Sequence, residues 1–409
     1  MGRDSFFHPK TLAKNKPFPR KPMNPTKATY DFIISGFGCA GMSLVYYLAH
    51  SKLRNCKILI LDNSCKETND RTWCYWAEKP LNIHPATEPI ISWQTIALSN
   101  GNTRIEKSLE NLRYFHLKSS DFYLAIRGLL KKFPHIELLQ DSVVECAETD
   151  EGAYVQTANY GVFHAKKVFN SIPNFSLNPS SKPILKQVFV GWKIKTTAPC
   201  FDPHTVVLMD FVQNTQNQTE FFYILPFSST EALVEYTAFS DQELDQCQME
   251  GMIDRFIRND IGQKAYEISF REQGSIPMTT QELSAYRFEH IIPMGTLAGW
   301  SKPSTGYTFY NIQKHCQRIV SCLEEENLSG MITLKRKPKY NFYDNILLNI
   351  ARKWPKKLPD VFINLFQTSS GPEVLKFLNE ESSLSEEIKI LSRLKFPIFI
   401  KSLLEYEKH

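Results

Sequence analysis

The clearest pattern of hydrophobic and polar positions lies between residues 30 and 62, YDFIISGFGCAGMSLVYYLAHSKLRNCKILILD. Residues 30–35 are a short apolar run of β-forming residues, which predicts a buried strand. Residues 42–50 carry apolar side chains at helical spacing, and residues 57–61 are a second buried-strand run that ends at Asp62. The order strand, helix, strand predicts a βαβ unit.

A glycine-rich turn joins the first predicted strand to the helix. Gly36 permits the tight turn, Gly38 lets a pyrophosphate approach the backbone, and Gly41 lets the helix pack close to the strand. The helix begins near Cys39 and Ala40, and its N-terminus faces the anion. We therefore expect the backbone of these five residues to bind the phosphates of a dinucleotide.

An acidic residue ends the second strand of the same unit. Asp62 lies where a carboxylate can bind a ribose hydroxyl of the dinucleotide. A GxGxxG turn alone is weak support, but a turn inside a complete βαβ unit favours dinucleotide binding strongly. The alternative is a glycine turn in an α/β domain that binds no nucleotide.

The rest of the chain divides into segments of different periodicity. A strand-like run at 90–98 is followed by short alternating segments that predict a small antiparallel insert returning to the parallel sheet. Residues 186–272 hold several strand-like runs and one expected helix at 242–258, which fits a sheet-based domain. From Asn341 onward the pattern is mostly helical.

These segments predict an α/β chain of several parts, and its 409 residues fit roughly two to three domains. We expect a Rossmann-type dinucleotide-binding domain with a β-sheet substrate domain inserted and a helical region at the C-terminus. The expected parts are a disordered basic tail at 1–29, a discontinuous dinucleotide-binding domain at 30–185 and 273–335, a β-rich substrate domain at 186–272, and a helical region at 336–409.

Composition narrows the class of protein further. The hydrophobic content of 42% is ample for a large core, and the nine cysteines form no CxxC pair. This cysteine usage predicts reduced thiols in the cytoplasm rather than a disulfide framework, and no metal site is expected. No apolar run reaches the length of about 18 residues that a membrane span needs, and no secretory signal is recognised at the N-terminus.

Charge is uneven along the chain, whose formal net charge is +5. Residues 1–29 carry seven Lys or Arg and one Asp, a net of +6, so the remaining residues are close to neutral. This proline-rich tail is interpreted as a solubilising segment or as a weak attractor of anionic lipid. Two further segments could touch a bilayer or pack on the core, residues 352–358 and 395–404. No basic patch with stacking aromatics points to nucleic acid.

Four segments together resemble the lycopene cyclase family of flavoproteins. The most specific is NDRTWCYW at 69–76, which is similar to the NDRTWCFW signature of that family. The others are the glycine turn, the run from Met209-Asp210-Phe211 through FYILP and Leu233-Val-Glu235-Tyr-Thr237, and the late stretch Ile292-Pro-Met-Gly295 with Pro303-Ser-Thr-Gly306-Tyr307. The resemblance runs in order from about residue 30 to about 405.

Two positions depart from the pattern of the family. The acidic segment of the family often has two consecutive carboxylates, whereas Tyr236 follows Glu235 here. Many members also have Asp-Ser-Arg or Asp-Ala-Thr-Gly where this chain has Asn170-Ser171-Ile172, at the end of the sheet before the substrate domain. The flavin contact expected at that point therefore does not carry over.

The resemblance implies a redox-neutral cyclisation that uses reduced FAD, with NAD(P)H needed only to reduce it. A proton is added to a terminal double bond of lycopene, a nearby alkene attacks the tertiary cation, and loss of a proton leaves a β-ionone ring, giving γ-carotene and then β-carotene. An alkene is a very poor base, so the site must also stabilise a carbocation in a dry pocket. Aromatic faces contribute about 0.5–2 kcal/mol each to that task.

The resemblance also selects the candidate site residues. Glu235 is expected to handle protons, because burial in an apolar site can keep a carboxyl protonated. Asp210 is the second catalytic candidate, as a partner or orienter of Glu235. Arg71 is expected to contact FAD or a local carboxylate. Gly295 and Gly306 are expected beside the isoalloxazine, so the Rossmann-type domain is interpreted as an FAD/NAD(P)-binding domain.

The substrate sets the expected location of the protein. A forty-carbon hydrocarbon must come from a bilayer, because each buried methylene is worth about 0.8 kcal/mol. We expect a cytoplasmic protein bound peripherally to the membrane surface, with lycopene as its partner. Ring type, the number of ends cyclised, the choice of NADH or NADPH and the oligomeric state stay open.

Two rival functions belong to other classes. The first is an FAD-dependent monooxygenase or reductase of an isoprenoid or polyene substrate, which would share both glycine segments but not the signature at 69–76. The second is a non-catalytic dinucleotide- or carotenoid-binding protein, which only Asn170-Ser171-Ile172 favours.

Overall fold

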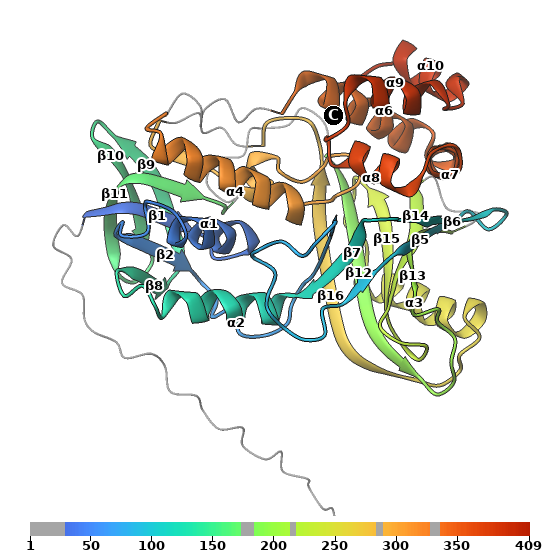
Figure 1. Cartoon of the computed structure of the whole chain (residues 1–409), viewed down its shortest axis with the longest axis horizontal. Coiled ribbons are helices and arrows are strands. Elements are labelled where there is room, and N and C mark those ends of the chain that lie inside the picture. Colours follow the sequence, from blue (N-terminus) through green and yellow to red (C-terminus); the bar gives the residue numbers. More distant parts are fainter. Residues whose placement is uncertain (1–28, 173–183, 213–217, 284–288, 328–335) are drawn as a thin grey trace, which may run out of the picture.

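The computed structural model describes residues 29–172, 184–212, 218–283, 289–327 and 336–409. The expected basic tail therefore lies outside the described residues, except for Thr29, which begins the first strand. Two large sheets lie next to each other, one flanked by α1, α2 and α4 and the other by the C-terminal helices (Figure 1). The α/β class, the Rossmann-type domain with a second sheet and the helical C-terminus are confirmed.

The first sheet has seven strands in the order β8-β2-β1-β11-β10-β9, with β17 also paired to β11. Strands β1, β2, β8, β11 and β17 run parallel, and β9 and β10 form the expected antiparallel insert. The strands are β1 Thr29–Ser35, β2 Ile58–Asp62, β8 Ile136–Gln140, β9 Val143–Thr149, β10 Gly152–Thr157, β11 Gly161–Asn170 and β17 Ile291–Pro293.

Three helices cover one face of this sheet, α1 Cys39–Ala49, α2 Ser119–Leu130 and α4 Phe309–Glu324. The buried side chains of α1, among them Leu44 and Leu48, pack with β1 and β2 and with the apolar stripe of α4. A separate core on the other face joins the sheet to its antiparallel insert. The helices therefore bring the start of α1 close to the segment that precedes α4.

The second sheet has seven strands in the order β16-β12-β15-β14-β13-β5-β6. Its strands are β5 Thr95–Ser99, β6 Arg104–Ser108, β12 Leu185–Thr196, β13 Thr205–Phe211, β14 Thr219–Pro226, β15 Glu231–Ser240 and β16 Tyr266–Met278. The expected boundaries are corrected here, because β5 and β6 extend this sheet although residues 30–185 were assigned to the dinucleotide-binding domain. Strand β16 also continues past residue 272.

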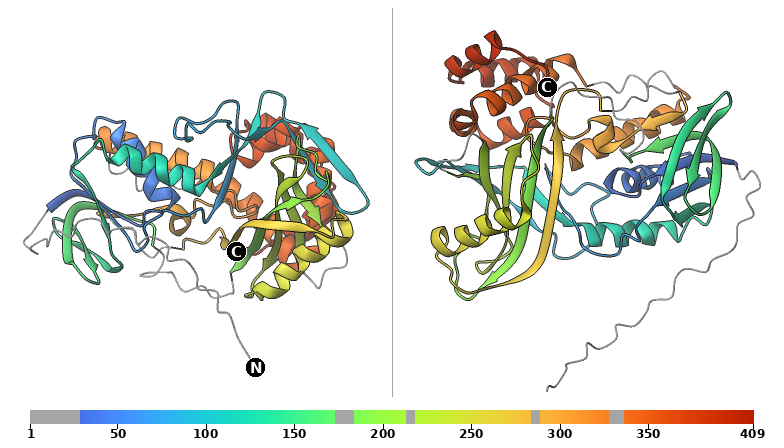
Figure 2. Two further views of the ribbon diagram at one scale, coloured as in Figure 1. Left: turned by 90° about the horizontal axis from the view of Figure 1, so that it is seen from below. Right: turned by 180° about the vertical axis from the view of Figure 1, so that it is seen from behind.

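Helices cover both faces of the second sheet (Figure 2). On one face, α3 Gln246–Arg255 continues as a π-helical turn Phe256–Asp260 and packs on residues such as Phe222 and Val234. On the other face lie the C-terminal helices, which share a core with β13, β14 and β15. Those helices are α6 Pro338–Lys353, α7 Leu358–Thr368, α8 Gly371–Leu378, α9 Leu384–Ser392 and α10 Phe396–Leu404, with a 3-10 turn Pro355–Lys357 before α7.

A small third sheet bridges the two large ones, with strands β3 Thr72–Ala77, β7 Arg113–Lys118 and β4 Ser92–Trp93 in the order β3-β7-β4. Strand β3 holds most of the signature at 69–76. The Trp76 indole donates to the Leu375 carbonyl oxygen at 3.0 Å, and the Trp93 indole donates to the Pro226 carbonyl oxygen at 3.0 Å. The signature strand is thus fixed between the Rossmann-type domain, the second sheet and the C-terminal helices.

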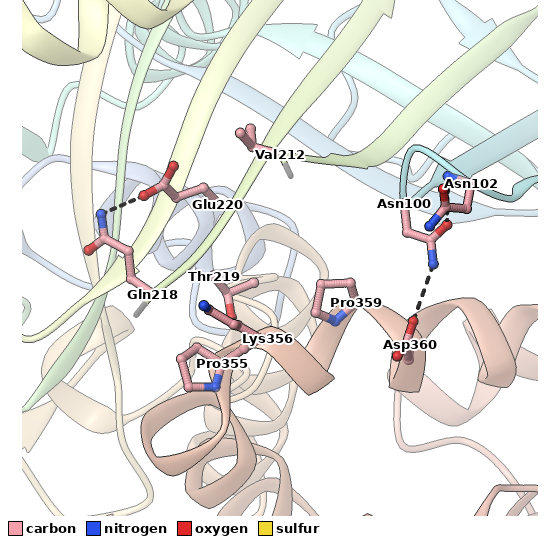
Figure 3. A pocket seen from close by; sticks show the side chains of 10 residues that line it. All are labelled: Asn100, Asn102, Val212, Gln218, Thr219, Glu220, Pro355, Lys356, Pro359 and Asp360. Atoms are coloured by element: carbon pink, nitrogen blue, oxygen red, sulfur yellow. Dashed lines mark hydrogen bonds between the residues drawn. The ribbon is translucent and has the colours of Figure 1, made fainter. Parts of the chain in front are cut away.

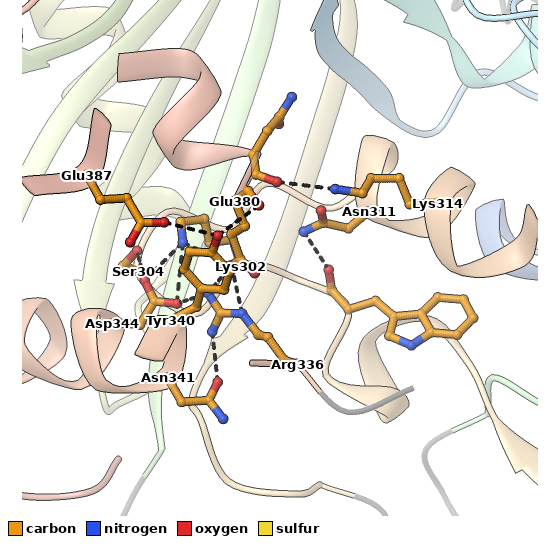
Figure 4. Close-up of polar contacts among 12 residues, drawn as sticks. Lys302, Ser304, Asn311, Lys314, Arg336, Tyr340, Asn341, Asp344, Glu380 and Glu387 are labelled. Atoms are coloured by element: carbon orange, nitrogen blue, oxygen red, sulfur yellow. Dashed lines mark hydrogen bonds and ion pairs between the residues drawn. The ribbon is translucent and has the colours of Figure 1, made fainter. Parts of the chain in front are cut away.

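A buried ion cluster ties the C-terminal helices to the segment before α4 (Figure 4). Asp344 is 1% exposed, and its carboxylate pairs with Lys302 at 3.2 Å and with Arg336. Lys302 and Arg336 also pair with Glu380, and the Ser304 hydroxyl donates to Asp344. Burial alone would raise the pKa of Asp344, but the two cations lower it below its usual range.

Removing this central carboxylate is expected to destabilise the protein. Asp344→Ala removes the more deeply buried of the two carboxylates that Lys302 and Arg336 share, and breaking a buried ion pair costs about 3–5 kcal/mol. Urea unfolding at pH 7 measures the loss. Glu106→Gln is the control, because Glu106 pairs with Arg104 on the surface at 52% side-chain exposure, where a pair is worth about 0–1 kcal/mol. Equal midpoints for both variants would contradict the expectation.

Candidate active site

The glycine turn has the geometry that a bound pyrophosphate requires. Gly36 has φ of +95°, and a Cβ on Gly41 would lie 2.1 Å from the Gly36 carbonyl oxygen. A Cβ on Gly38, by contrast, would meet nothing within 4 Å, so the backbone is open to approach there. Helix α1 begins at Cys39. Among the described residues no side chain caps the first N–H groups of this helix, and such a helix end is suited to an anion.

Asp62 lies at the end of β2 as expected, and it also holds the turn in place. One carboxylate oxygen accepts the Phe37 N–H at 2.7 Å, and the other accepts the Ser64 N–H at 2.8 Å and the Ser64 hydroxyl at 2.9 Å. The Ser64 and Phe37 bonds direct the carboxylate to the rim of the glycine turn. A carboxylate has about four lone-pair positions, so it retains capacity for a ribose hydroxyl.

The late glycine stretch meets the early one. Gly295 has φ of +61°, and a Cβ there would lie 3.2 Å from the Ala40 methyl group. Gly306 has φ of +72°. A Cβ there would lie 2.5 Å from Oε1 of Gln187, which lies near the start of β12 in the second sheet. That oxygen is buried and accepts no hydrogen bond from the described residues. The two predicted glycine segments therefore line one region between the two sheets.

Arg71 has contacts that differ from the expected pairing with a carboxylate. Its guanidinium donates to two backbone carbonyl oxygens, of Asp70 at 2.8 Å and of Gln273 at 3.0 Å. The Asp70 carboxylate instead accepts the Ser119 hydroxyl at 2.9 Å and the Tyr123 hydroxyl at 2.8 Å. Arg71 thus joins the signature to β16, and a contact with FAD stays a prediction.

Glu235 lies in the middle of the second sheet on the face toward β3. It is 9% exposed, and one carboxyl oxygen accepts the Thr237 hydroxyl at 2.7 Å. Burial, and next the charge of Glu272, raise the pKa of Glu235 to about 8. The sequence-based choice of Glu235 as a proton donor therefore has a physical basis, because a carboxyl with this pKa carries its proton at neutral pH.

Sequence reasoning missed Glu272. It lies on β16, is 6% exposed, and accepts the Thr72 N–H of the signature strand at 2.8 Å. Burial raises the pKa of Glu272 to about 7, opposed by its bonds to Thr72 and by the Arg71 charge. Strand β12 separates it from Glu235, and Gly191 of β12 is the register partner of both. The sequence feature that accompanies this pair is the small residue Gly191, but only the strand register shows that it lies between the two glutamates.

Tyrosine hydroxyls and one thiol surround this pair. The Tyr114 and Tyr223 hydroxyls are hydrogen bonded at 2.9 Å, and Tyr223 is the register partner of Glu235. Cys74 of the signature faces the same site, where burial raises the pKa of its thiol to about 12 although hydrogen bonds to Tyr223 and Tyr114 lower it. The Tyr307 ring, next to Gly306, contacts Trp76 edge-on at 4.6 Å. The two carboxyls are therefore buried beside aromatic side chains.

Asp210 does not join this site. In the ladder of β13, β14 and β15 it is opposite Phe222 and Tyr236, whereas Glu235 is opposite Tyr223. Because successive residues of a strand point to opposite faces, Asp210 lies on the α3 face and Glu235 on the β3 face. The expectation that Asp210 orients Glu235 is corrected accordingly. Burial raises the pKa of Asp210, with Ser99 donating a compensating bond.

Titration of Glu235 is expected to make stability depend on pH. The folded pKa is raised from 4.5 to about 8, so the protonated carboxyl contributes stability below pH 4.5 that is lost as pH rises to about 8. Glu235→Gln removes this loss. The melting temperature of the variant relative to wild type is therefore expected to rise between pH 5 and pH 8.5, as measured by calorimetry. A constant difference across that range would contradict the raised pKa.

Comparison with known proteins assigns the chain to a family. The family model described as lycopene cyclase protein matches residues 31–405. The chain belongs to the lycopene cyclase family. It is 32% identical over 127 residues to a lycopene beta-cyclase of Paracoccus sp. (strain N81106 / MBIC 01143), covering 30% of this chain and 32% of the relative. It is 25% identical over 297 residues to a lycopene beta-cyclase of Pantoea ananas, covering 68% of this chain and 71% of the relative.

A solved structure supports the fold of this lycopene cyclase family member. A geranylgeranyl bacteriochlorophyll reductase-like protein of Thermoplasma acidophilum superposes with a TM-score of 0.62, at 15% identity, over 92% of this chain and 99% of that protein. At this identity the likeness shows the shared architecture of two sheets and C-terminal helices. The predicted resemblance to the lycopene cyclase family is thus confirmed by the family match.

The lining of one surface hollow includes neither Glu235 nor Glu272 (Figure 3). The hollow has a volume of about 280 Å³ and lies where the 3-10 turn before α7 meets the β5–β6 loop and β14. Its lining is largely polar: Asn100, Asn102, Gln218, Glu220, Lys356 and Asp360 are among its residues. Such a lining does not suit a hydrocarbon chain. Within the described ranges, no helix combines the length and apolarity that crossing a bilayer requires.

Proposed function

We propose that this protein is a lycopene cyclase that forms β-ionone rings by acid–base chemistry and would need bound, reduced FAD for activity. The observation that carries the proposal is the buried carboxyl of Glu235, which has a raised pKa and faces the signature strand and a cluster of tyrosines. Family membership and the two curated relatives, both lycopene beta-cyclases, support the same reaction. The proposed products are γ-carotene and β-carotene.

The residues present fit FAD. Gly38 leaves the backbone open where a pyrophosphate would lie, while Gly36 and Gly41 pack too tightly to admit any side chain. The N–H groups of Cys39 and Ala40 would bind the phosphates, Asp62 would bind the ribose, and Gly295 and Gly306 would lie beside the ring system. Reduced FAD, when bound, supplies negative charge close to a developing carbocation, and NAD(P)H is the proposed source of its electrons.

Glu235 would transfer the proton, and the aromatic side chains around it would stabilise the cation. Glu235 would deliver its proton to the terminal alkene, since an alkene is protonated only by an acid held in a dry site. The rings of Tyr223, Tyr114 and Tyr307 would stabilise positive charge at about 0.5–2 kcal/mol each where they face it. The same apolar walls exclude water, which would otherwise trap the cation as an alcohol.

Expression in cells that accumulate lycopene tests the proposal. The expected result is a ringed isomer of unchanged mass in the extracted pigments, absent from cells without the chain. Unchanged lycopene beside well-expressed, flavin-loaded protein would reject cyclisation. A product heavier by one oxygen would indicate the monooxygenase rival, and one heavier by two hydrogens would indicate the reductase.

A hydrocarbon substrate also requires contact with a membrane. The outer face of α10, within the segment 395–404 that the sequence singled out, exposes Ile400 at 52%, Leu403 at 51% and Leu404 at 82%. Lys401 on the same helix lies over the Trp354 ring at 4.6 Å, next to the basic 3-10 turn. We propose that this apolar face with flanking lysines lies on the bilayer surface.

Two polar substitutions on this face are expected to weaken membrane binding. Leu403→Ser with Leu404→Ser removes exposed apolar area, and burying a leucine is worth about 1.5–3 kcal/mol, so partition into vesicles should fall about tenfold or more. Co-sedimentation with vesicles of mixed neutral and anionic lipid measures it. Leu124→Ser is the matched control, since Leu124 is 74% exposed on α2. Equal losses in both proteins would contradict a specific α10 contact.

A further inference from the structure

Glu235 and Glu272 converge over one glycine of the second sheet. Strand β12 runs between their strands, and Gly191 pairs with Glu235 on one side and with Glu272 on the other. Residues directly opposite each other in a ladder project from the same face, so both side chains rise on the β3 face. Two strand spacings of about 4.8 Å separate their backbones, a gap that two glutamate side chains can close.

Gly191 leaves the room for this approach. A Cβ on Gly191 would lie 3.2 Å from Cγ and 3.5 Å from Oε1 of Glu272. The Glu272 side chain therefore leans over β12, toward the strand that carries Glu235. A side chain at position 191 would press on the Glu272 side chain in this position.

The hydrogen bonds of the two carboxyls differ. Oε2 of Glu272 accepts the Thr72 N–H at 2.8 Å, while Oε1 is buried and has no hydrogen-bond partner among the described residues. Glu235 accepts only the Thr237 hydroxyl at 2.7 Å within the same ranges. A backbone N–H stabilises the charged form of Glu272, and Glu235 has no comparable donor. The arrangement suits one carboxylate and one carboxylic acid.

Charged and titratable side chains from the elements packed on this face lie around Glu235 and Glu272. The charge of Arg71 lowers the pKa of Glu272, but the hydrogen bonds of its guanidinium go to backbone carbonyl oxygens. The other groups facing the site are Asp70 and Cys74 of the signature, Tyr114 of β7, Tyr223 of β14 and Tyr307. Arg71 thus favours a charge on Glu272 rather than on Glu235.

We propose that Glu235 and Glu272 act as one acid pair that holds a single proton, with Glu235 delivering it and Glu272 positioning it. The inference rests on the proposed cyclisation and names a second carboxylate for it. The charge on Glu272, fixed by Thr72 and Arg71, disfavours a second charge on Glu235 and so keeps Glu235 protonated at neutral pH. This second carboxylate comes from β16, not from the residue after Glu235, which is Tyr236.

Glu235 gives up one proton and recovers one proton during the formation of each ring. The O–H bond of Glu235 breaks as the electron pair of the terminal alkene takes its proton into a new C–H bond. A second alkene closes the ring on the tertiary cation, and a neighbouring ring carbon then loses a proton to the Glu235 carboxylate as the ring double bond forms. The pair starts and ends with one proton, and the product is an isomer of the substrate.

The pH dependence of cyclisation tests Glu272. Purified, FAD-loaded wild type, Glu272→Gln and Glu272→Asp are compared over pH 5.5–9.5 with lycopene in vesicles. Glu272→Gln removes the charge, so the alkaline limb of its rate profile is expected at lower pH by about one unit or more. Glu272→Asp keeps the charge and is expected to keep the wild-type limb. Glu220→Gln is the matched control, because Glu220 is a buried residue on the opposite face of the same sheet.

A second readout needs no turnover. The infrared carbonyl band of a buried, protonated carboxyl is expected in wild type at about pH 7.5, between the pKa values of the two glutamates, and is expected to be weaker in Glu235→Gln. In Glu272→Gln it should titrate away at lower pH than in wild type. The proposed acid pair would be rejected if well-folded Glu272→Gln kept both the wild-type alkaline limb and the wild-type titration of the carbonyl band. Equal loss of folding in Glu272→Gln and Glu272→Asp would also reject it. If wild type forms no ring but the band shifts as expected, the pair stands and the cyclisation is rejected.

Discussion

Replacing Glu235 by Gln is expected to lower the rate of ring formation about 10²- to 10⁴-fold, the usual contribution of a positioned general acid. Gln keeps the shape of Glu and can still accept the Thr237 hydroxyl bond, but it has no proton to give to an alkene. The variant should fold, because it removes a carboxyl whose charged form burial disfavours. Its FAD content is expected to equal that of wild type.

Pigment analysis and purified protein together separate the possible causes. Cells that make lycopene and the variant should keep lycopene, while cells with wild type convert it. Absorbance of bound flavin in the purified variant shows whether the cofactor site is intact. Glu220→Gln again serves as the control for removing a buried carboxylate from this sheet. Wild-type conversion by Glu235→Gln would mean that another group donates the proton.

Local pattern was enough to predict the βαβ unit of the first sheet. The two apolar runs, the glycine turn and Asp62 lie within 33 residues, so short-range geometry places them without reference to the rest of the chain. The structure has β1, α1 and β2 there, and Asp62 reaches back to the Phe37 N–H. Each piece fits the others, because a βαβ unit is specified by local periodicity and turn chemistry.

The local sequence pattern does not predict which strands pair with each other. Residues 95–108 alternate as strands do, but nothing in their periodicity says which sheet they join, and they pair with β13 rather than with the first sheet. The ladder of β13 and β14 is irregular between Val207 and Asp210, and one residue of register decides which face a side chain takes. Asp210 could therefore not be assigned to the α3 face from its sequence motif.

Glu272 was missed for a related reason. Its neighbours on β16 include Arg271 and Gln273, and such a polar run predicts a solvated edge strand. The strand is indeed at the edge of the sheet, and most of its side chains are at least partly exposed. Glu272 is buried because β3 lies over it, a contact that joins residues 200 positions apart. Only the assembled fold shows that a second carboxyl faces Glu235.

Gly41→Ala is expected to abolish FAD binding and, with it, all cyclisation. The new Cβ would lie 2.1 Å from the Gly36 carbonyl oxygen, closer than any real contact, and that oxygen belongs to backbone that cannot rotate away. Helix α1 must then move off β1, which displaces the N–H groups of Cys39 and Ala40 from the phosphates. Purified Gly41→Ala should contain less than about a tenth of the flavin of wild type, a loss of about 1.4 kcal/mol or more in binding.

Gly128→Ala is the matched control for this substitution. Gly128 also lies in a helix, α2, but a Cβ there would meet nothing within 4 Å. Ala is favoured over Gly in a helix interior by about 0.5–1 kcal/mol, so this variant should bind FAD normally and melt at a slightly higher temperature. Flavin absorbance of the two purified variants and their calorimetric melting decide the matter. Full flavin content in Gly41→Ala would contradict a phosphate site at this turn, because the close approach of α1 to β1 is what places the helix N-terminus there.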